Sequence, residues 1–119
     1  MDNEKFKIIN LVKDLIVQID RNLVNFPKKE IELKREIRTT SYNLLLLTYE
    51  ANNTDNKERK HELQEKAVAY VKYLNFFFNL CYDKQIINNK KYLKFGEKLD
   101  IIVRYLVAWK NSERKNIGV

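Results

Sequence analysis

The chain has 119 residues, of which 45% are hydrophobic and 33% charged, and it contains two glycines and one proline. This length suits one domain, and the scarcity of glycine and proline favours long helices over sheets or flexible linkers. A single cysteine and a single histidine exclude an intramolecular disulfide and a cysteine-based metal site, while a net charge of +7 favours an acidic partner.

The first helix is expected over residues 3–24, because apolar side chains recur there at intervals of three and four. Its core stripe contains Ile9, Val12, Ile16, Ile19 and Leu23. Pro27 should end this helix and begin the next, since proline disfavours helix in the preceding residue but fits a first helical turn.

The second helix, over residues 28–53, has two apolar faces. One face contains Ile37, Ser41, Leu44, Leu45 and Thr48, and the other contains Tyr42, Leu46 and Tyr49. A polar turn follows, in which Asp55 and Glu58 form a capping-box-like start for a third helix over residues 55–84.

The third helix is apolar nearly all round. Its core seam alternates intervals of four and three, as in a heptad repeat, through Leu63, Ala67, Tyr70, Leu74, Phe77 and Cys81. One flank carries Val68, Val71, Phe78 and Tyr82, and the other carries Tyr73, Phe76 and Leu80.

The fourth helix is expected over residues 88–110, with Asn88 as its N-cap. Its seam contains Tyr92, Phe95, Leu99, Ile102, Leu106 and Trp109. Residues 111–119 are predicted to form a frayed basic tail. Four helices joined by short links predict an all-α, up-down-up-down antiparallel four-helix bundle over residues 1–110.

The third and fourth helices carry more large apolar side chains than one core stripe requires, which favours a second buried surface in a homo-oligomer. The candidate interface residues are Tyr73, Phe76, Phe78, Tyr82, Ile101, Arg104 and Tyr105. The alternative is that these aromatic residues only widen the core. Arg104, surrounded by apolar residues, should form an ion pair with Asp100 or with another subunit, or contact a phosphate.

Basic residues concentrate in residues 87–119, which hold eight basic and three acidic side chains and so five of the seven excess positive charges. A stripe at helical spacing contains Lys90, Lys94 and Lys98, with Lys91 nearby. It forms either a solvated face or a surface for phosphates. A second candidate set for nucleic-acid binding is Lys28, Lys29, Lys34, Arg35 and Arg38.

Residues for catalysis are scarce, so we expect no enzyme, no cofactor and no small-molecule substrate. His61 lies in a charged segment without a second histidine, and Cys81 lies on an apolar seam. The sequence contains no glycine-rich phosphate loop. The polar N-terminal segment and the absence of an apolar run of ~18 residues predict a cytoplasmic protein without a membrane partner.

Several segments are typical of one known family: residues 25–28 (NFPK), residues 44–52 (LLLLTYEAN), Tyr73-Leu74 with Leu80, and Tyr92 and Leu99 followed by residues 102–110 (IVRYLVAWK). On these segments, which span about residues 10–111, the chain resembles the accessory variability determinant proteins of diversity-generating retroelements. Those are small four-helix-bundle proteins related to the proteins encoded in ribosomal RNA intervening sequences.

This resemblance implies a homopentameric barrel, basic and non-catalytic, that binds a reverse transcriptase and template RNA and supports mutagenic complementary-DNA synthesis. The alternative is an oligomeric protein-interaction module of the intervening-sequence type, which binds no nucleic acid. Neighbouring genes separate the two, since only the first predicts an adjacent reverse transcriptase gene and paired repeats.

Overall fold

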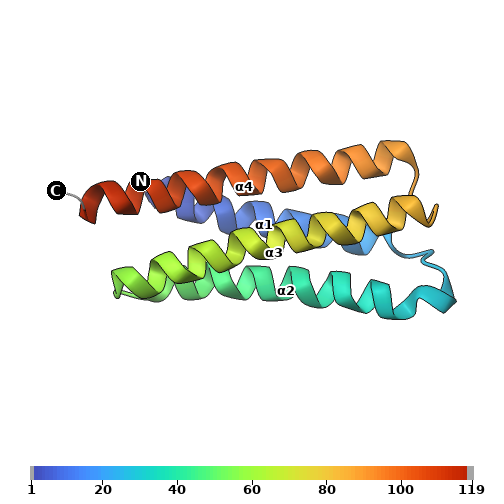
Figure 1. Cartoon of the computed structure of the whole chain (residues 1–119), viewed down its shortest axis with the longest axis horizontal. Coiled ribbons are helices and arrows are strands. Elements are labelled where there is room, and N and C mark those ends of the chain that lie inside the picture. Colours follow the sequence, from blue (N-terminus) through green and yellow to red (C-terminus); the bar gives the residue numbers. More distant parts are fainter. Residues whose placement is uncertain (1, 118–119) are drawn as a thin grey trace.

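Four long α-helices packed against one another make up the computed structural model, which describes residues 2–117, with side chains described for residues 7–112. Each helix contacts its neighbour in sequence, and the first also contacts the fourth. Successive helices run in opposite directions (Figure 1), so the four-helix bundle predicted from the sequence is confirmed. The bundle measures 52 × 23 × 19 Å. Its helices are α1 (Asp2–Asn22), α2 (Ile31–Asn53), α3 (Lys57–Asp83) and α4 (Asn89–Ile117).

Pro27 lies in the link between α1 and α2, as predicted, but α1 ends two residues earlier than expected. α1 ends at Asn22, whose side-chain amide donates to the Gln18 carbonyl at 2.7 Å. Pro27 has φ −58° and ψ 135°, which is extended backbone rather than helix. A short 3-10 helix, η1 (Lys28–Glu30), then leads into α2, which begins three residues later than expected.

The start of α3 differs from the expectation. Asn56 is the N-cap, and its side-chain oxygen accepts from the Arg59 backbone N–H at 2.9 Å. Asp55 lies one residue outside this position and is exposed. The capping-box assignment to Asp55 was therefore wrong by one residue, because asparagine caps a helix as well as aspartate does and the run contains both.

The link between α3 and α4 is defined by two sets of capping bonds. The Gln85 N–H donates to the Tyr82 carbonyl at 3.0 Å and the Ile86 N–H to the Cys81 carbonyl at 2.8 Å, the paired bonds of a Schellman motif. Gln85 occupies the left-handed position of this motif, with φ 61°. Asn88 then caps α4, accepting from the Lys91 N–H at 2.8 Å, which confirms its predicted role.

The end of α4 also differs from the expectation. The helix continues to Ile117, seven residues beyond the predicted end, so the backbone of residues 111–117 is helical rather than frayed. Residues 118 and 119 of the predicted tail lie outside the described residues. The sequence offers no stop signal at residue 110, because Gly118 is the first helix-ending residue after it.

The core contains most of each predicted seam, although Ile16, Leu45 and Tyr92 are only partly buried. The buried stripe of α3 is wider than its seam. Leu63, Ala67, Leu74, Phe77 and Cys81 are buried, whereas Tyr70 is only half-buried. Val71 and Phe78, which were placed on a flank, are 1% exposed. A helix that packs against two neighbours buries more than a single heptad seam.

Four polar residues are also buried. Ser41 and Thr48 lie on the predicted core face of α2, and their hydroxyl groups donate to carbonyls of the preceding turn, Arg38 at 2.8 Å and Leu45 at 2.7 Å. Thr40 and Gln64 complete the set, and within the described part of the chain the Gln64 amide has no hydrogen-bond partner. None of the helices, over the residues described, is long and apolar enough to cross a bilayer.

Candidate nucleic-acid interface

The antiparallel topology brings the two predicted basic sets to one end of the bundle. α1 and α3 end there and α2 and α4 begin there, on the right in Figure 1. Segments 20–38 and 82–98, which build this end, hold eleven basic and six acidic residues. They therefore account for five of the seven net positive charges of the whole chain. We call this region the basic end.

Among the described side chains, the α4 set contributes three cations without an acidic partner. Lys90, Lys91 and Lys94 are exposed in the first turns of α4, and within residues 7–112 none of the three forms an ion pair with a carboxylate. Lys98 differs, because its ammonium group lies 2.9 Å from the Asp14 carboxylate of α1. The predicted four-lysine stripe is thus reduced to three side chains available for a phosphate.

The α2 set extends from the 3-10 helix into the first three turns of α2. Lys28 and Lys29 are exposed and Lys34 is half-buried. Arg35 lies 2.5 Å from Glu32, in a pair whose two side chains are both mostly exposed. Such a pair contributes little to stability and exchanges readily for another anion.

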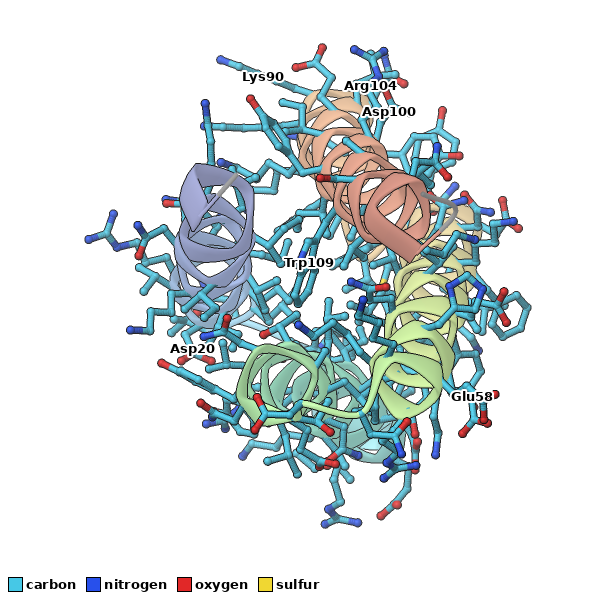
Figure 2. The ribbon with its side chains drawn as sticks, turned by 90° about the vertical axis from the view of Figure 1, so that its left-hand side faces the viewer. Asp20, Glu58, Lys90, Asp100, Arg104 and Trp109 are labelled. Atoms are coloured by element: carbon cyan, nitrogen blue, oxygen red, sulfur yellow. The ribbon has the colours of Figure 1, made fainter. Side chains whose placement is uncertain are left out.

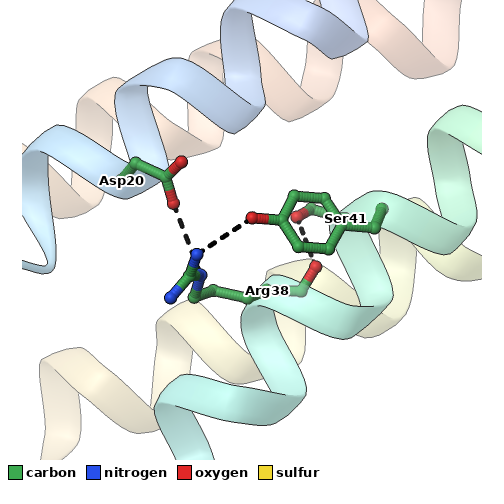
Figure 3. A network of polar contacts seen from close by, with 4 residues as sticks. Asp20, Arg38 and Ser41 are labelled. Carbon is green, nitrogen blue, oxygen red and sulfur yellow. Dashed lines mark hydrogen bonds and ion pairs between the residues drawn. The ribbon is translucent and has the colours of Figure 1, made fainter.

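Arg38 is held in a network of its own (Figure 3). Its guanidinium lies 3.5 Å from the Asp20 carboxylate of α1 and donates to the Tyr42 hydroxyl at 3.1 Å. The hydrogen bond to Tyr42, together with the electrostatic influence of Tyr42 and Asp20, raises the pKa of Arg38. Arg38 thus connects α2 to α1 through Asp20 and lies close to the Tyr42 ring.

Both basic sets flank α1. Lys98 of α4 reaches Asp14, and Arg38 of α2 reaches Asp20, so α1 lies between them. Arg21, in the last turn of α1, adds a cation in this gap, where a cavity of about 100 Å³ is lined by Arg21, Phe26 and Lys91 among others. Arg21 is not among the basic residues predicted for the site. A basic residue in the last turn of a helix was the available signal, but it also has the ordinary role of complementing the helix dipole.

Arg104 forms the ion pair expected with Asp100, at 2.7 Å. Its surroundings differ from the expectation, because its side chain is 76% exposed and points away from the core together with Asp100 (Figure 2). Apolar neighbours in sequence do not bury a residue that lies on the outer side of its helix. Trp109, in contrast, lies between the four helices.

The candidate oligomer interface requires one correction. Phe78 is buried inside the subunit and stacks on Phe95 of α4, with ring centroids 4.3 Å apart. It therefore belongs to the core of the bundle and cannot contact another subunit in this conformation. Tyr82 is partly covered too, since its ring stacks on Tyr92 of α4 at 4.6 Å.

The remaining apolar candidates form two separate surfaces. Tyr73 and Phe76, with parallel rings 6.4 Å apart, form the α3 surface. Ile101 and Tyr105 form the α4 surface. This surface lies on the side of α4 that faces α1, because the ammonium group of Lys7, a residue of α1, lies 4.9 Å from the Tyr105 ring centroid. α1 and α3 occupy opposite corners of the bundle (Figure 2), so the two surfaces lie on different sides of the subunit.

The single histidine and the single cysteine lie in surroundings that do not favour catalysis. His61 lies 3.0 Å from Glu65 on the same helix. Cys81 is buried, and burial raises the pKa of its thiol to about 11, which disfavours the reactive thiolate. Among the described residues, no three histidine, cysteine or acidic side chains gather in a way that could hold a metal ion.

No known protein family, curated protein or solved structure was found to match the chain.

Proposed function

We propose that the protein is a non-catalytic RNA-binding accessory protein of a diversity-generating retroelement, which binds template RNA and a reverse transcriptase. The observation that carries this proposal is the basic end, where Lys28, Lys29, Lys90, Lys91 and Lys94 are exposed within one region of the bundle. Clustered cations of this kind bind a phosphate backbone by releasing its counter-ions, without reading the bases. The polymerase would supply all of the chemistry.

The choice of partner rests on the resemblance of the second and fourth helices to accessory variability determinant proteins. Residues 44–52 and 102–110, which carry much of that resemblance, lie within α2 and α4. A template RNA supplies the polyanion that the basic end requires, and the reverse transcriptase is the second partner that the resemblance implies. The protein would then hold the template close to the polymerase.

The subunit is also proposed to assemble into a homopentameric ring. The α3 surface and the α4 surface are different from each other and lie on different sides, which suits a head-to-tail contact better than a symmetric dimer. Head-to-tail contacts close into a ring when the rotation between subunits permits it. Five copies of a chain with charge +7 would bring a formal charge near +35 to one assembly.

Fluorescence anisotropy with labelled RNAs of unrelated sequence tests the RNA-binding proposal. We expect similar affinities for all of them and a steep linear fall of log affinity with log salt concentration. Absence of binding in low salt, or a strong preference for one sequence with a shallow salt dependence, would contradict it.

The second candidate is the oligomeric protein-interaction module that binds no nucleic acid. The exposed aromatic residues Tyr73 and Phe76 favour it, because they provide apolar contact area on the surface of α3. Co-purification with the reverse transcriptase after nuclease treatment distinguishes the candidates. The accessory role predicts capture of the polymerase together with RNA binding, and the module predicts neither.

A further inference from the structure

A shallow pocket of about 290 Å³ lies on the outer side of the first three turns of α2. Its volume is at the lower limit of pockets that hold a small organic group. Three cations and two apolar side chains converge on it. The lining residues are Ile31, Lys34, Arg35, Arg38, Thr39 and Tyr42.

The two apolar side chains of the pocket are exposed. Ile31 is 49% exposed and Tyr42 is 44% exposed, although both lie on a helix with a well-filled core face. Helical spacing puts Ile31, Arg38 and Tyr42 on one side of α2, with the cations between the isoleucine and the ring. The pocket therefore offers apolar contact and positive charge within a few ångströms of each other.

The Tyr42 ring is held in place before any ligand arrives. Its hydroxyl accepts from Arg38 at 3.1 Å, and Arg38 is held in turn by Asp20 on α1. The guanidinium carbon lies 5.9 Å from the ring centroid, so the ring and the cation form one unit. An oriented aromatic ring costs little conformational entropy when it binds a flat partner.

Two further cations of the pocket are available for an anion. Lys34 has no ion pair within the described side chains, and Arg35 is engaged only by the exposed Glu32. Both lie about one turn from Arg38 on the same helix. A ligand with a flat face on Tyr42 would thus have positive charge beside it.

We propose that this pocket binds one unpaired nucleotide of single-stranded RNA, with the base against Tyr42 and Ile31 and the neighbouring phosphate on Lys34 and Arg35. The inference rests on the RNA-binding function proposed above and adds a preference for single strands. A duplex keeps its base faces stacked and would use only the cations. An acidic polypeptide likewise provides charge but no flat apolar face.

The test compares Tyr42→Leu with Tyr49→Leu in the full chain. Tyr49 is the matched control, because it lies on the same helix, two turns farther from the basic end, and is 36% exposed. The probes are a labelled single-stranded RNA of about 12 nucleotides, a blunt RNA duplex of the same length, and polyglutamate. Tyr42→Phe is included because it keeps the ring and removes only the hydroxyl.

Tyr42→Leu should weaken single-stranded binding by roughly 5-fold or more and leave duplex binding within about 2-fold, since base stacking is lost while the charges remain. Tyr49→Leu should stay close to the parent chain on every probe. Tyr42→Phe keeps the ring but loses the hydrogen bond to Arg38 that orients it, so it should weaken single-stranded binding less than Tyr42→Leu does. Equal losses for Tyr42→Leu and Tyr49→Leu, or equal losses on single strand and duplex, would overturn the pocket while leaving the RNA-binding function intact. A loss on polyglutamate as large as that on RNA would assign the pocket to an acidic protein instead.

A parent chain that binds neither RNA probe would overturn both the pocket and the function.

Photo-crosslinking keeps the test independent of the folding of the variants. The unaltered chain is irradiated with a single-stranded RNA that contains 4-thiouridine, and the adduct is mapped by mass spectrometry. The expected adduct lies within residues 31–42, whereas adducts confined to α3 or to the C-terminal half of α4 would contradict the pocket.

Discussion

Gln85 shows how a single backbone position can be strained for its residue type. Its φ of 61° lies in the left-handed region, which glycine occupies without cost and which a side chain disfavours by roughly 1 kcal/mol. Gln85→Gly is therefore expected to raise the free energy of unfolding by about 0.5–1 kcal/mol, measured by urea denaturation. Gln85→Ala retains a Cβ and serves as the control, with no gain expected. A loss of stability for Gln85→Gly would mean that its side chain makes a contact worth more than the strain.

Phe76 and Phe78 form a second residue-scale comparison, with the same side chain in two environments. Phe78 is 1% exposed and stacks on Phe95, whereas Phe76 is 50% exposed. Phe78→Ala should lower the free energy of unfolding by about 3–5 kcal/mol, because truncation leaves a cavity in the core. Phe76→Ala should lower it by less than about 1 kcal/mol in the isolated subunit. Similar losses at the two positions would contradict the assignment of Phe78 to the core.

At the scale of elements, periodicity predicted the existence and order of the helices but not the width of their buried stripes. The α4 seam was correct from Phe95 to Trp109, where every predicted seam residue is buried. α3 was apolar nearly all round, so the spacing could not distinguish Phe78, which faces α4, from Phe76, which faces outward. Only the positions of neighbouring helices resolve that choice.

The basic residues of the candidate site could be predicted from the sequence, but their ion-pair partners could not. Lysine spacing on the fourth helix indicated a stripe, yet the partner that removes Lys98 from it, Asp14, lies on another helix. The same holds for Arg38, whose partners include Asp20 of α1. Contacts between residues far apart in sequence depend on the packing of helices, which no local pattern encodes.

The α4 lysines lead to a prediction about this element. Replacing Lys90, Lys91 and Lys94 by glutamine should weaken RNA binding roughly tenfold to a hundredfold in 0.1 M salt and reduce the salt slope by about 2. The matched control removes the same charge from α3, at the exposed residues Lys57, Lys66 and Lys72. Fluorescence anisotropy at several salt concentrations measures both quantities. Equal effects of the two triple variants would show that net charge, rather than the basic end, governs binding.

At the scale of the whole molecule, the antiparallel topology determines where the basic residues gather. The cations that lie apart along the sequence meet at one end, because two helices finish where two others begin. The apolar α3 and α4 surfaces include residues farther along the bundle, at Tyr73, Phe76, Ile101 and Tyr105. A ring built through these surfaces would leave the basic ends free and facing in the same direction.

Head-to-tail assembly has a consequence that a symmetric dimer lacks. Phe76→Asp should disable the α3 surface and Ile101→Asp the α4 surface, so each variant alone should be a monomer near 14.4 kDa by light scattering. Each variant retains the surface that the other has lost. A mixture of the two should therefore form a dimer through the one intact pair of surfaces and no larger species, whereas the parent chain should form a ring. Leu93→Asp, at an exposed site outside both surfaces, is the control and should assemble like the parent. A parent chain that is itself monomeric at micromolar concentration, or a mixture that remains monomeric, would contradict head-to-tail assembly through these two surfaces.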